Sequence, residues 1–150
     1  GILLYEWNIL HHYEKKSRVS MWDIDGLICK DPPNDKNTEE YEAYLKNPIP
    51  MIIPTTLVGE IVTYRLEKYR NLTEEFLQKQ GIKYGKLTMF NAPNRQVRSL
   101  MMGPAEFKAN VYKNADWAQL FIESEIKQAE KIFELSGKPV FCYANGKVYQ

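Results

Sequence analysis

The stretch Val19-Ser20-Met21-Trp22-Asp23-Ile24-Asp25-Gly26 joins a short apolar run to two acidic residues and a glycine. The apolar run predicts a buried parallel strand, and Gly26 predicts the break that ends it. Carboxylates one residue apart point to opposite sides of an extended chain, but a break lets both turn towards one pocket. Open α/β sheets bind ligands at this carboxyl end of their strands. Because two neighbouring carboxylates are costly without a cation or a proton, the pair predicts a site that binds one.

The composition is that of an ordinary globular domain. The chain has 150 residues and a formal net charge of +1, which argues against a broad nucleic-acid surface but leaves room for a local groove. Its length suffices for one domain with a core. No apolar run approaches the roughly 20 residues of a membrane span, and we expect no signal peptide. Cys29 and Cys142 stand in apolar segments, which favours reduced, buried thiols in a cytoplasmic protein.

Strand-like and helical patterns alternate along the chain. Strands are expected at 19–22, 59–63, 86–90, 118–122 and 139–143, with extended structure also at 27–29. Helices are expected at 38–47, 71–80, 104–112 and 126–136, and a polar loop at 91–103. The alternation predicts βαβ units and a mostly parallel central sheet, in a Rossmann-like, three-layer α/β fold.

Local signals mark the ends of these elements. Thr38 is expected to cap the first helix, and Asn71 the second, where Glu74 completes a capping-box spacing. The last helix should bury 126, 129 and 133 and end at Gly137. Asn145-Gly146 predicts a hairpin that folds residues 147–149 back on the last parallel strand.

The chain divides into two regions. Residues 19–150 are expected to form the domain, and residues 1–18 an N-terminal extension or linker that packs on it. Gly1 stands where a methionine would begin a chain, and residues 2–12 are typical of the end of an earlier element. We therefore expect a piece of a longer protein or a processed chain.

Further polar residues follow strand ends or lie on helices that should face the same edge of the sheet. They are Thr63, Lys108, Glu123 and Glu125. With the acidic pair they supply what phosphoryl transfer needs. One carboxylate can attack phosphorus, and a second can protonate the leaving oxygen. A hydroxyl and an ammonium can hold the phosphoryl oxygens, and further acids can hold Mg²⁺.

Each of these residues also has a plainer interpretation. An Asp-x-Asp after a strand is often only a turn, and Thr63 fits a strand by β-propensity. Lys108 is one of 20 basic residues, most of which should face solvent. The two glutamates would favour the N-terminus of the next helix. The order and placement of all the groups together favour the catalytic interpretation.

On these residues the chain resembles the haloacid dehalogenase superfamily, mostly Mg²⁺-dependent phosphatases that act through an aspartyl-phosphate. The resemblance spans roughly 19–143, and its most specific part is Trp22-Asp23-Ile24-Asp25-Gly26. It implies that Asp23 is the nucleophile and a Mg²⁺ ligand, and that Asp25 is the general acid and base and binds the metal through its backbone carbonyl.

The same resemblance assigns the other polar residues. Thr63 fits the family's second motif and Lys108 its third. Glu123 stands at the position of the family's metal-binding acid, and Glu125 is a second acid that could bind the metal. The family usually has aspartates where this chain has Glu123-Ser124-Glu125. The insertion after the first motif is short, so we expect a minimal cap or none and a rather open site.

Two shorter resemblances bear on the substrate. Thr63-Tyr64-Arg65, with Arg70 and Thr73, is similar to the polynucleotide 3′-phosphatase branch, which implies that Arg65 and Tyr64 bind substrate. A charged loop is the alternative interpretation of this segment.

The second short resemblance lies near the start of the chain. Tyr5-Glu6-Trp7-Asn8 and His11-His12 resemble the tail of phosphoribosyltransferase domains that some proteins fuse ahead of such a phosphatase. This implies an N-terminal phosphoribosyltransferase domain and a nucleotide, phosphoribosyl or other small phosphorylated substrate. A non-catalytic regulatory module and a polynucleotide-end phosphatase remain the alternative functions.

Overall fold

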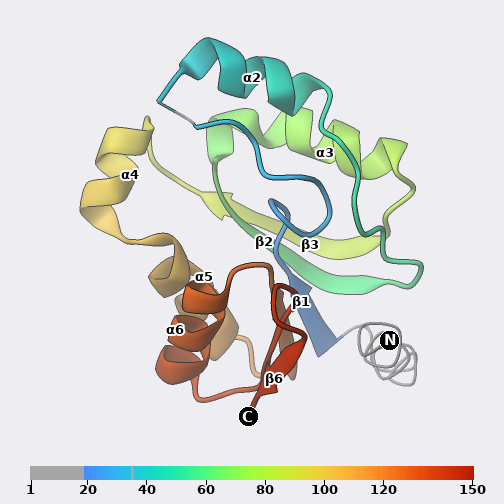
Figure 1. Ribbon diagram of the computed structural model, residues 1–150, viewed down its shortest axis with the longest axis vertical. Coiled ribbons are helices and arrows are strands. Elements are labelled where there is room, and N and C mark those ends of the chain that lie inside the picture. The colour runs from blue at the N-terminus through green and yellow to red at the C-terminus, as the bar shows by residue number, and fades with distance from the viewer. Residues whose placement is uncertain (1–18, 35) are drawn as a thin grey trace.

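The computed structural model describes residues 19–34 and 36–150, which form an α/β fold around one sheet (Figure 1). The expected extension over residues 1–18 lies outside the described residues. The strands are β1 (Ser20–Trp22), β2 (Val58–Leu66), β3 (Tyr84–Phe90), β4 (Leu120–Glu123), β5 (Val140–Cys142) and β6 (Lys147–Tyr149). The helices are α2 (Thr38–Lys46), the 3-10 turn η2 (Glu67–Tyr69), α3 (Arg70–Lys79), α4 (Arg95–Met101), α5 (Pro104–Lys113) and α6 (Ile126–Ser136).

The sheet has six strands in the order β3-β2-β1-β4-β5-β6. Strands β1 to β5 run parallel, and β6 pairs antiparallel with β5. The chain builds β2 and β3 on one side of β1 and then returns to place β4 on the other. The strand order therefore reverses beside β1, and such a reversal opens a crevice at the carboxyl ends of the strands. The predicted mostly parallel sheet and the hairpin after Gly146 are confirmed, and the fold is consistent with a Rossmann-like architecture.

Helices cover both faces of the sheet. Adjacent residues of β1 point to opposite faces, so Trp22 joins one apolar cluster and Met21 the other. The first cluster lies under α2 and α3, and includes Tyr41, Leu45, Phe76 and Leu77. The second lies under α5 and α6, and includes Ala109, Tyr112, Ala129 and Ile132. Figure 1 shows the two helix pairs on opposite sides of the strands. Burial of each large apolar side chain stabilises the folded state by about 1.5–3 kcal/mol.

Strand β2 is longer than its apolar run predicts. The expected strand 59–63 continues to Leu66, so that Tyr64 and Arg65 lie within the strand and not in a charged loop. The charged Arg65 is 2% exposed, because a carboxylate from the loop after β1 neutralises it. The polar residues of this segment therefore led to a wrong prediction of where β2 ends.

Other local predictions were also wrong. Asn37, not Thr38, caps α2 by accepting the Glu40 N–H. Helix α3 begins at Arg70 directly after η2, so Asn71 lies inside it. The predicted loop 91–103 contains α4, whose N-cap Asn94 accepts the Val97 N–H, and residues 27–28 form a turn. In α6 residues 126 and 133 were expected in the core, but residue 126 is 41% exposed and residue 133 is only half-buried. Residue 132 is buried in the core instead.

Two further predictions concern the cysteines and membranes. Cys29 and Cys142 are buried and free, as expected. Over residues 19–34 and 36–150, every helix is too short or too polar to cross a membrane. Gly137 takes a left-handed φ of 68° and ends α6, as its position in the sequence predicts.

Candidate active site

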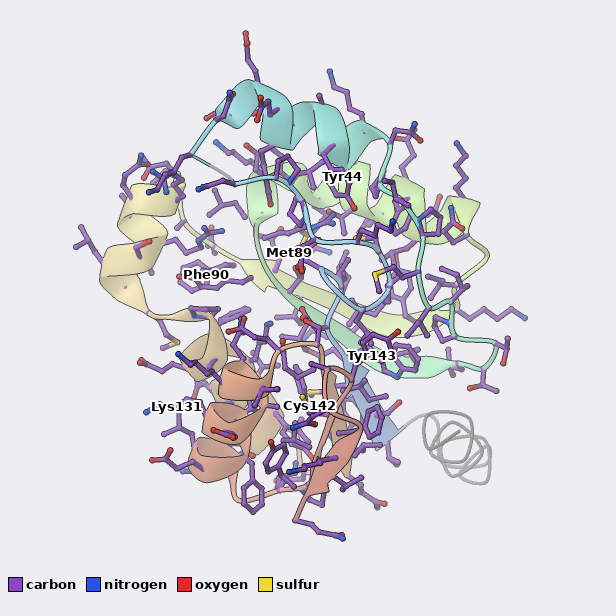
Figure 2. All side chains as sticks on the ribbon, in the orientation of Figure 1. Tyr44, Met89, Phe90, Lys131, Cys142 and Tyr143 are labelled. Carbon is purple, nitrogen blue, oxygen red and sulfur yellow. The ribbon has the colours of Figure 1, made fainter. Side chains whose placement is uncertain are left out.

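A cavity of about 800 Å³ opens at the carboxyl ends of β1 and β4, where the strand order reverses. Asp23, Asp25 and Gly26 line it from the end of β1, Thr63 and Tyr64 from β2, and Lys108 from α5. Ser124, Glu125 and Gln128 line it from the segment that joins β4 to α6. Tyr143, which is labelled in Figure 2, lines it from the end of β5. Most residues predicted from the sequence are thus brought to one cavity, and the exceptions are Glu123 behind it and Arg65.

The centre of the site is a buried charge cluster. The Lys108 Nζ atom lies 3.2 Å from Asp23 Oδ1 and 2.9 Å from Glu123 Oε2. Asp23 and Lys108 are each 3% exposed, and Glu123 is fully buried. One ammonium therefore faces two carboxylates in a region that water hardly reaches, and the cluster is short of positive charge.

The pKa shifts follow from that imbalance. Burial raises the pKa of Asp23 well above its ordinary value, and the neighbouring Glu123 raises it further against the attraction of Lys108. Burial by itself would lower the pKa of Lys108, but Asp23 and Glu123 outweigh it and raise that pKa. The ammonium therefore stays charged, and Asp23 retains its proton to a higher pH than an exposed aspartate does.

A serine hydroxyl gathers three oxygen atoms beside this cluster. Ser124 Oγ lies 3.1 Å from the backbone oxygen of Asp25, and 3.4 Å from both Asp23 Oδ2 and Glu123 Oε1. A hydroxyl has a single proton to donate, so it satisfies one of these acceptors at a time. The three oxygens therefore converge with unused capacity for a positive charge.

The close approach of Ser124 explains Gly26. A Cβ atom at residue 26 would lie 2.8 Å from Ser124 Oγ, and the φ of 81° is one that other residues rarely adopt. Glycine is thus the residue that lets the loop after β1 pass the end of β4. This contact brings the Asp25 carbonyl to Ser124.

The second acid, Asp25, is held by a buried arginine. Arg65 Nη2 donates to Asp25 Oδ1 at 2.6 Å, and Arg65 Nε donates to Asp25 Oδ2 at 3.1 Å. Arg65 Nη1 donates to Thr73 Oγ1 at 3.2 Å, and the Thr73 hydroxyl donates to the Tyr69 carbonyl. The Asp25 side chain is 23% exposed and lines the cavity, whereas Arg65 does not line it. Arg65 therefore contacts the site through Asp25 and does not itself line the cavity.

We predict that Arg65→Lys destabilises the fold by about 1–3 kcal/mol, because an ammonium cannot replace the two-pronged contact to Asp25 and the bond to Thr73. Urea unfolding at neutral pH measures the change. The matched control is Arg70→Lys, since Arg70 makes the same fork with Glu67 but is about one-third exposed. The control should cost less than about 1 kcal/mol. Equal costs for the two variants would contradict the special role of burial at Arg65.

The remaining predicted residues take different places. Thr63 is 1% exposed, and its hydroxyl accepts the Arg65 N–H at 3.2 Å. The Tyr64 ring lies edge-on to Phe90, labelled in Figure 2, and its hydroxyl donates to the Met102 carbonyl at 2.6 Å. Glu125, expected as a second metal acid, is exposed at the rim of the cavity.

Some residues of the site were missed by reasoning from sequence. Gln128 accepts from Lys108 Nζ at 3.0 Å and donates to Glu125 Oε2 at 2.8 Å. Asp31 lines the cavity, and its pKa is raised by burial and by Asp25 and Glu125. A signal existed for Gln128, because it stands three residues after Glu125, the residue that precedes α6, and so lies on the same side of the start of that helix. No comparable signal marked Asp31, because a loop carries no periodicity.

The donor set fits a small hard cation. Within the part of the chain that the structure describes, no group of three His, Cys, Asp or Glu side chains is placed to hold a metal ion. Mg²⁺ commonly uses only one or two carboxylates, with waters and a phosphate completing its shell. Asp23, Glu123 and the Asp25 carbonyl are oxygen donors that converge on Ser124 and carry excess negative charge. These residues would hold the ion.

Comparison with family models, with curated proteins and with solved structures gives no match. The chemistry of the site therefore rests on its own geometry. That geometry combines a buried carboxylate beside an ammonium, a second carboxylate in a fixed orientation, and a cavity open to a ligand.

Proposed function

We propose that the chain is a Mg²⁺-dependent phosphomonoesterase of the haloacid dehalogenase type, which acts through an aspartyl-phosphate on Asp23. The observation that carries the proposal is the Asp23–Lys108–Glu123 cluster, buried behind a cavity where the strand order reverses. A buried carboxylate with a raised pKa and a specific charge partner in a cleft is typical of a functional residue. The minimal cap expected from the short insertion after β1 is part of the same proposal.

The residues divide the chemistry between them. An Asp23 carboxylate oxygen attacks phosphorus, and the bond from phosphorus to the ester oxygen breaks. Asp25, oriented by Arg65, first takes up a proton from solvent and gives it to the departing oxygen, and it later takes a proton from the water that cleaves the acyl phosphate. Lys108 and the Thr63 hydroxyl offer positive charge and a hydrogen bond to the phosphoryl oxygens. When bound, Mg²⁺ supplies charge neutralisation for the phosphoryl group.

The lining of the cavity favours a small substrate. Its carboxylates belong to Asp23, Asp25, Asp31 and Glu125, whereas its cations are Lys108 and Lys127. This excess of negative charge repels the backbone of a polynucleotide, which presents many phosphates. A volume of about 800 Å³ accommodates a ligand of the size of a nucleotide or a phosphoribosyl compound. We therefore propose such small monoesters as substrates, together with an N-terminal phosphoribosyltransferase domain in the full-length protein.

The proposal is tested with an aryl phosphate and a panel of sugar phosphates, mononucleotides and oligonucleotide 3′-phosphates. We predict turnover with Mg²⁺ and its loss, by at least about a hundredfold, with EDTA, because the buried carboxylates alone repel a phosphate. Readdition of Mg²⁺ should restore the rate, and Asp116→Asn, at an exposed aspartate, should leave it unchanged. Absence of Mg²⁺-dependent turnover across the panel would favour a non-catalytic module. Turnover of oligonucleotide 3′-phosphates alone would favour a polynucleotide-end phosphatase.

A further inference from the structure

The Lys108 ammonium has all of its donors in use. Its acceptors are Asp23 Oδ1 at 3.2 Å, Glu123 Oε2 at 2.9 Å and Gln128 Oε1 at 3.0 Å. An ammonium carries three N–H donors and no acceptor, so three partners saturate it. A phosphoryl oxygen can bind Lys108 only if one of these partners gives way.

Gln128 is the partner that can give way. Asp23 and Glu123 are acidic and nearly or fully buried, and a carboxylate attracts the ammonium through its charge as well as through a hydrogen bond. The Gln128 amide is neutral and only partly buried, and it lines the cavity together with Lys108. Its Nε2 atom is bonded to the exposed Glu125 carboxylate at 2.8 Å, which offers it an alternative anchor at the rim.

We propose that Gln128 Oε1 occupies the place on Lys108 that a phosphoryl oxygen of the substrate takes, and that substrate binding displaces it. This inference rests on the proposed function, because it concerns the same site. The exchange replaces a neutral acceptor by an anionic one, which favours the bound state at an ammonium. Gln128 thus keeps a buried lysine satisfied in the free protein, at the expense of phosphate affinity.

The experiment measures the affinity for inorganic phosphate by calorimetry at a fixed Mg²⁺ concentration. Gln128→Ala should bind phosphate about three- to tenfold more tightly than the wild type, because the ammonium then lacks an acceptor that phosphate supplies. Gln128→Met, which keeps the bulk but cannot compete through oxygen, should also bind more tightly. Gln128→Glu should bind at least about tenfold more weakly, since a carboxylate holds Lys108 more firmly and repels the anion.

The matched control is Gln119→Ala, the same change at an exposed residue before β4, at the other end of that strand. It should leave phosphate affinity unchanged. Unchanged or weaker binding by Gln128→Ala overturns the inference, as does tighter binding by the alanine variant but not by the methionine variant. Tighter binding by both without any turnover by the wild type would support the inference and refute the hydrolysis. Turnover by the wild type, together with phosphate affinities that do not change with the residue at position 128, would support the hydrolysis and refute the inference about Gln128.

Discussion

Asp23→Asn is expected to lower the turnover of phosphomonoesters by at least about a thousandfold and to make the fold more stable at neutral pH. An amide oxygen is a poor nucleophile, and loss of a covalent nucleophile has effects of this size or larger in other enzymes. The gain in stability has a separate cause. One ammonium faces two buried carboxylates, and the variant leaves it with Glu123 alone.

The pH dependence gives the sign of the stability effect. The pKa of Asp23 in the folded protein is raised above the ordinary 3.8 by burial and by Glu123 and Asp25, although Lys108 opposes the shift. Folding therefore favours the protonated form, and the wild type loses stability as pH rises from about 3.8 towards the raised value. Asp23→Asn lacks this loss, so the two proteins should differ most at neutral pH and least at acid pH.

Thermal melting in EDTA from acid to neutral pH measures this difference, and turnover with Mg²⁺ measures the catalytic effect. Asp116→Asn serves as the control in both, because Asp116 is exposed and lies outside the cavity. A variant that melts below the wild type at neutral pH would mean that the Asp23 charge stabilises the fold. Residual turnover within tenfold of the wild type would remove Asp23 from the role of nucleophile.

The fold could be predicted from sequence where the signals were local and periodic. Apolar runs gave the parallel strands, and Asn145-Gly146 and Gly137 marked turns whose geometry depends on the residues themselves. The prediction failed where tertiary contacts override local polarity. The charge of Arg65 predicts a loop residue. In the structure Arg65 lies inside β2, because Asp25, 40 positions earlier in the chain, neutralises it.

The sequence predicted which residues line the candidate site better than it predicted the contacts between them. The ends of β1 and β4 must meet in a sheet of this order, so the meeting of Asp23 with Glu123 follows from topology. The bond between Asp25 and Arg65 could not be foreseen, because it depends on how a loop packs over β2. The saturation of Lys108 by Gln128 likewise depends on the way α6 packs against α5.

The second large effect is expected at Lys108. Lys108→Met keeps the length of the side chain but removes the charge, and leaves the Asp23 and Glu123 carboxylates facing each other in a buried region. Removing one partner of a buried ion pair typically costs about 3–5 kcal/mol, because the remaining charge is uncompensated. We predict a loss of this size at pH 7, together with loss of turnover, since no ammonium remains to hold the phosphoryl group.

The cost of Lys108→Met should shrink as pH falls, because Asp23, whose pKa is raised by burial and by Glu123, takes up a proton and its repulsion from Glu123 disappears. Urea unfolding at pH 7 and near pH 4 measures this trend, with the exposed Lys113→Met on the same helix as the control. The double variant with Asp23→Asn provides a second check. Asp23→Asn should stabilise the Lys108→Met protein more than it stabilises the wild type, because without Lys108 the change removes only the repulsion between Asp23 and Glu123 and no attraction. This coupling between the two changes distinguishes lost compensation from lost packing. Strict additivity of the two changes would mean that Lys108 stabilises the fold through its alkyl chain and not through its charge.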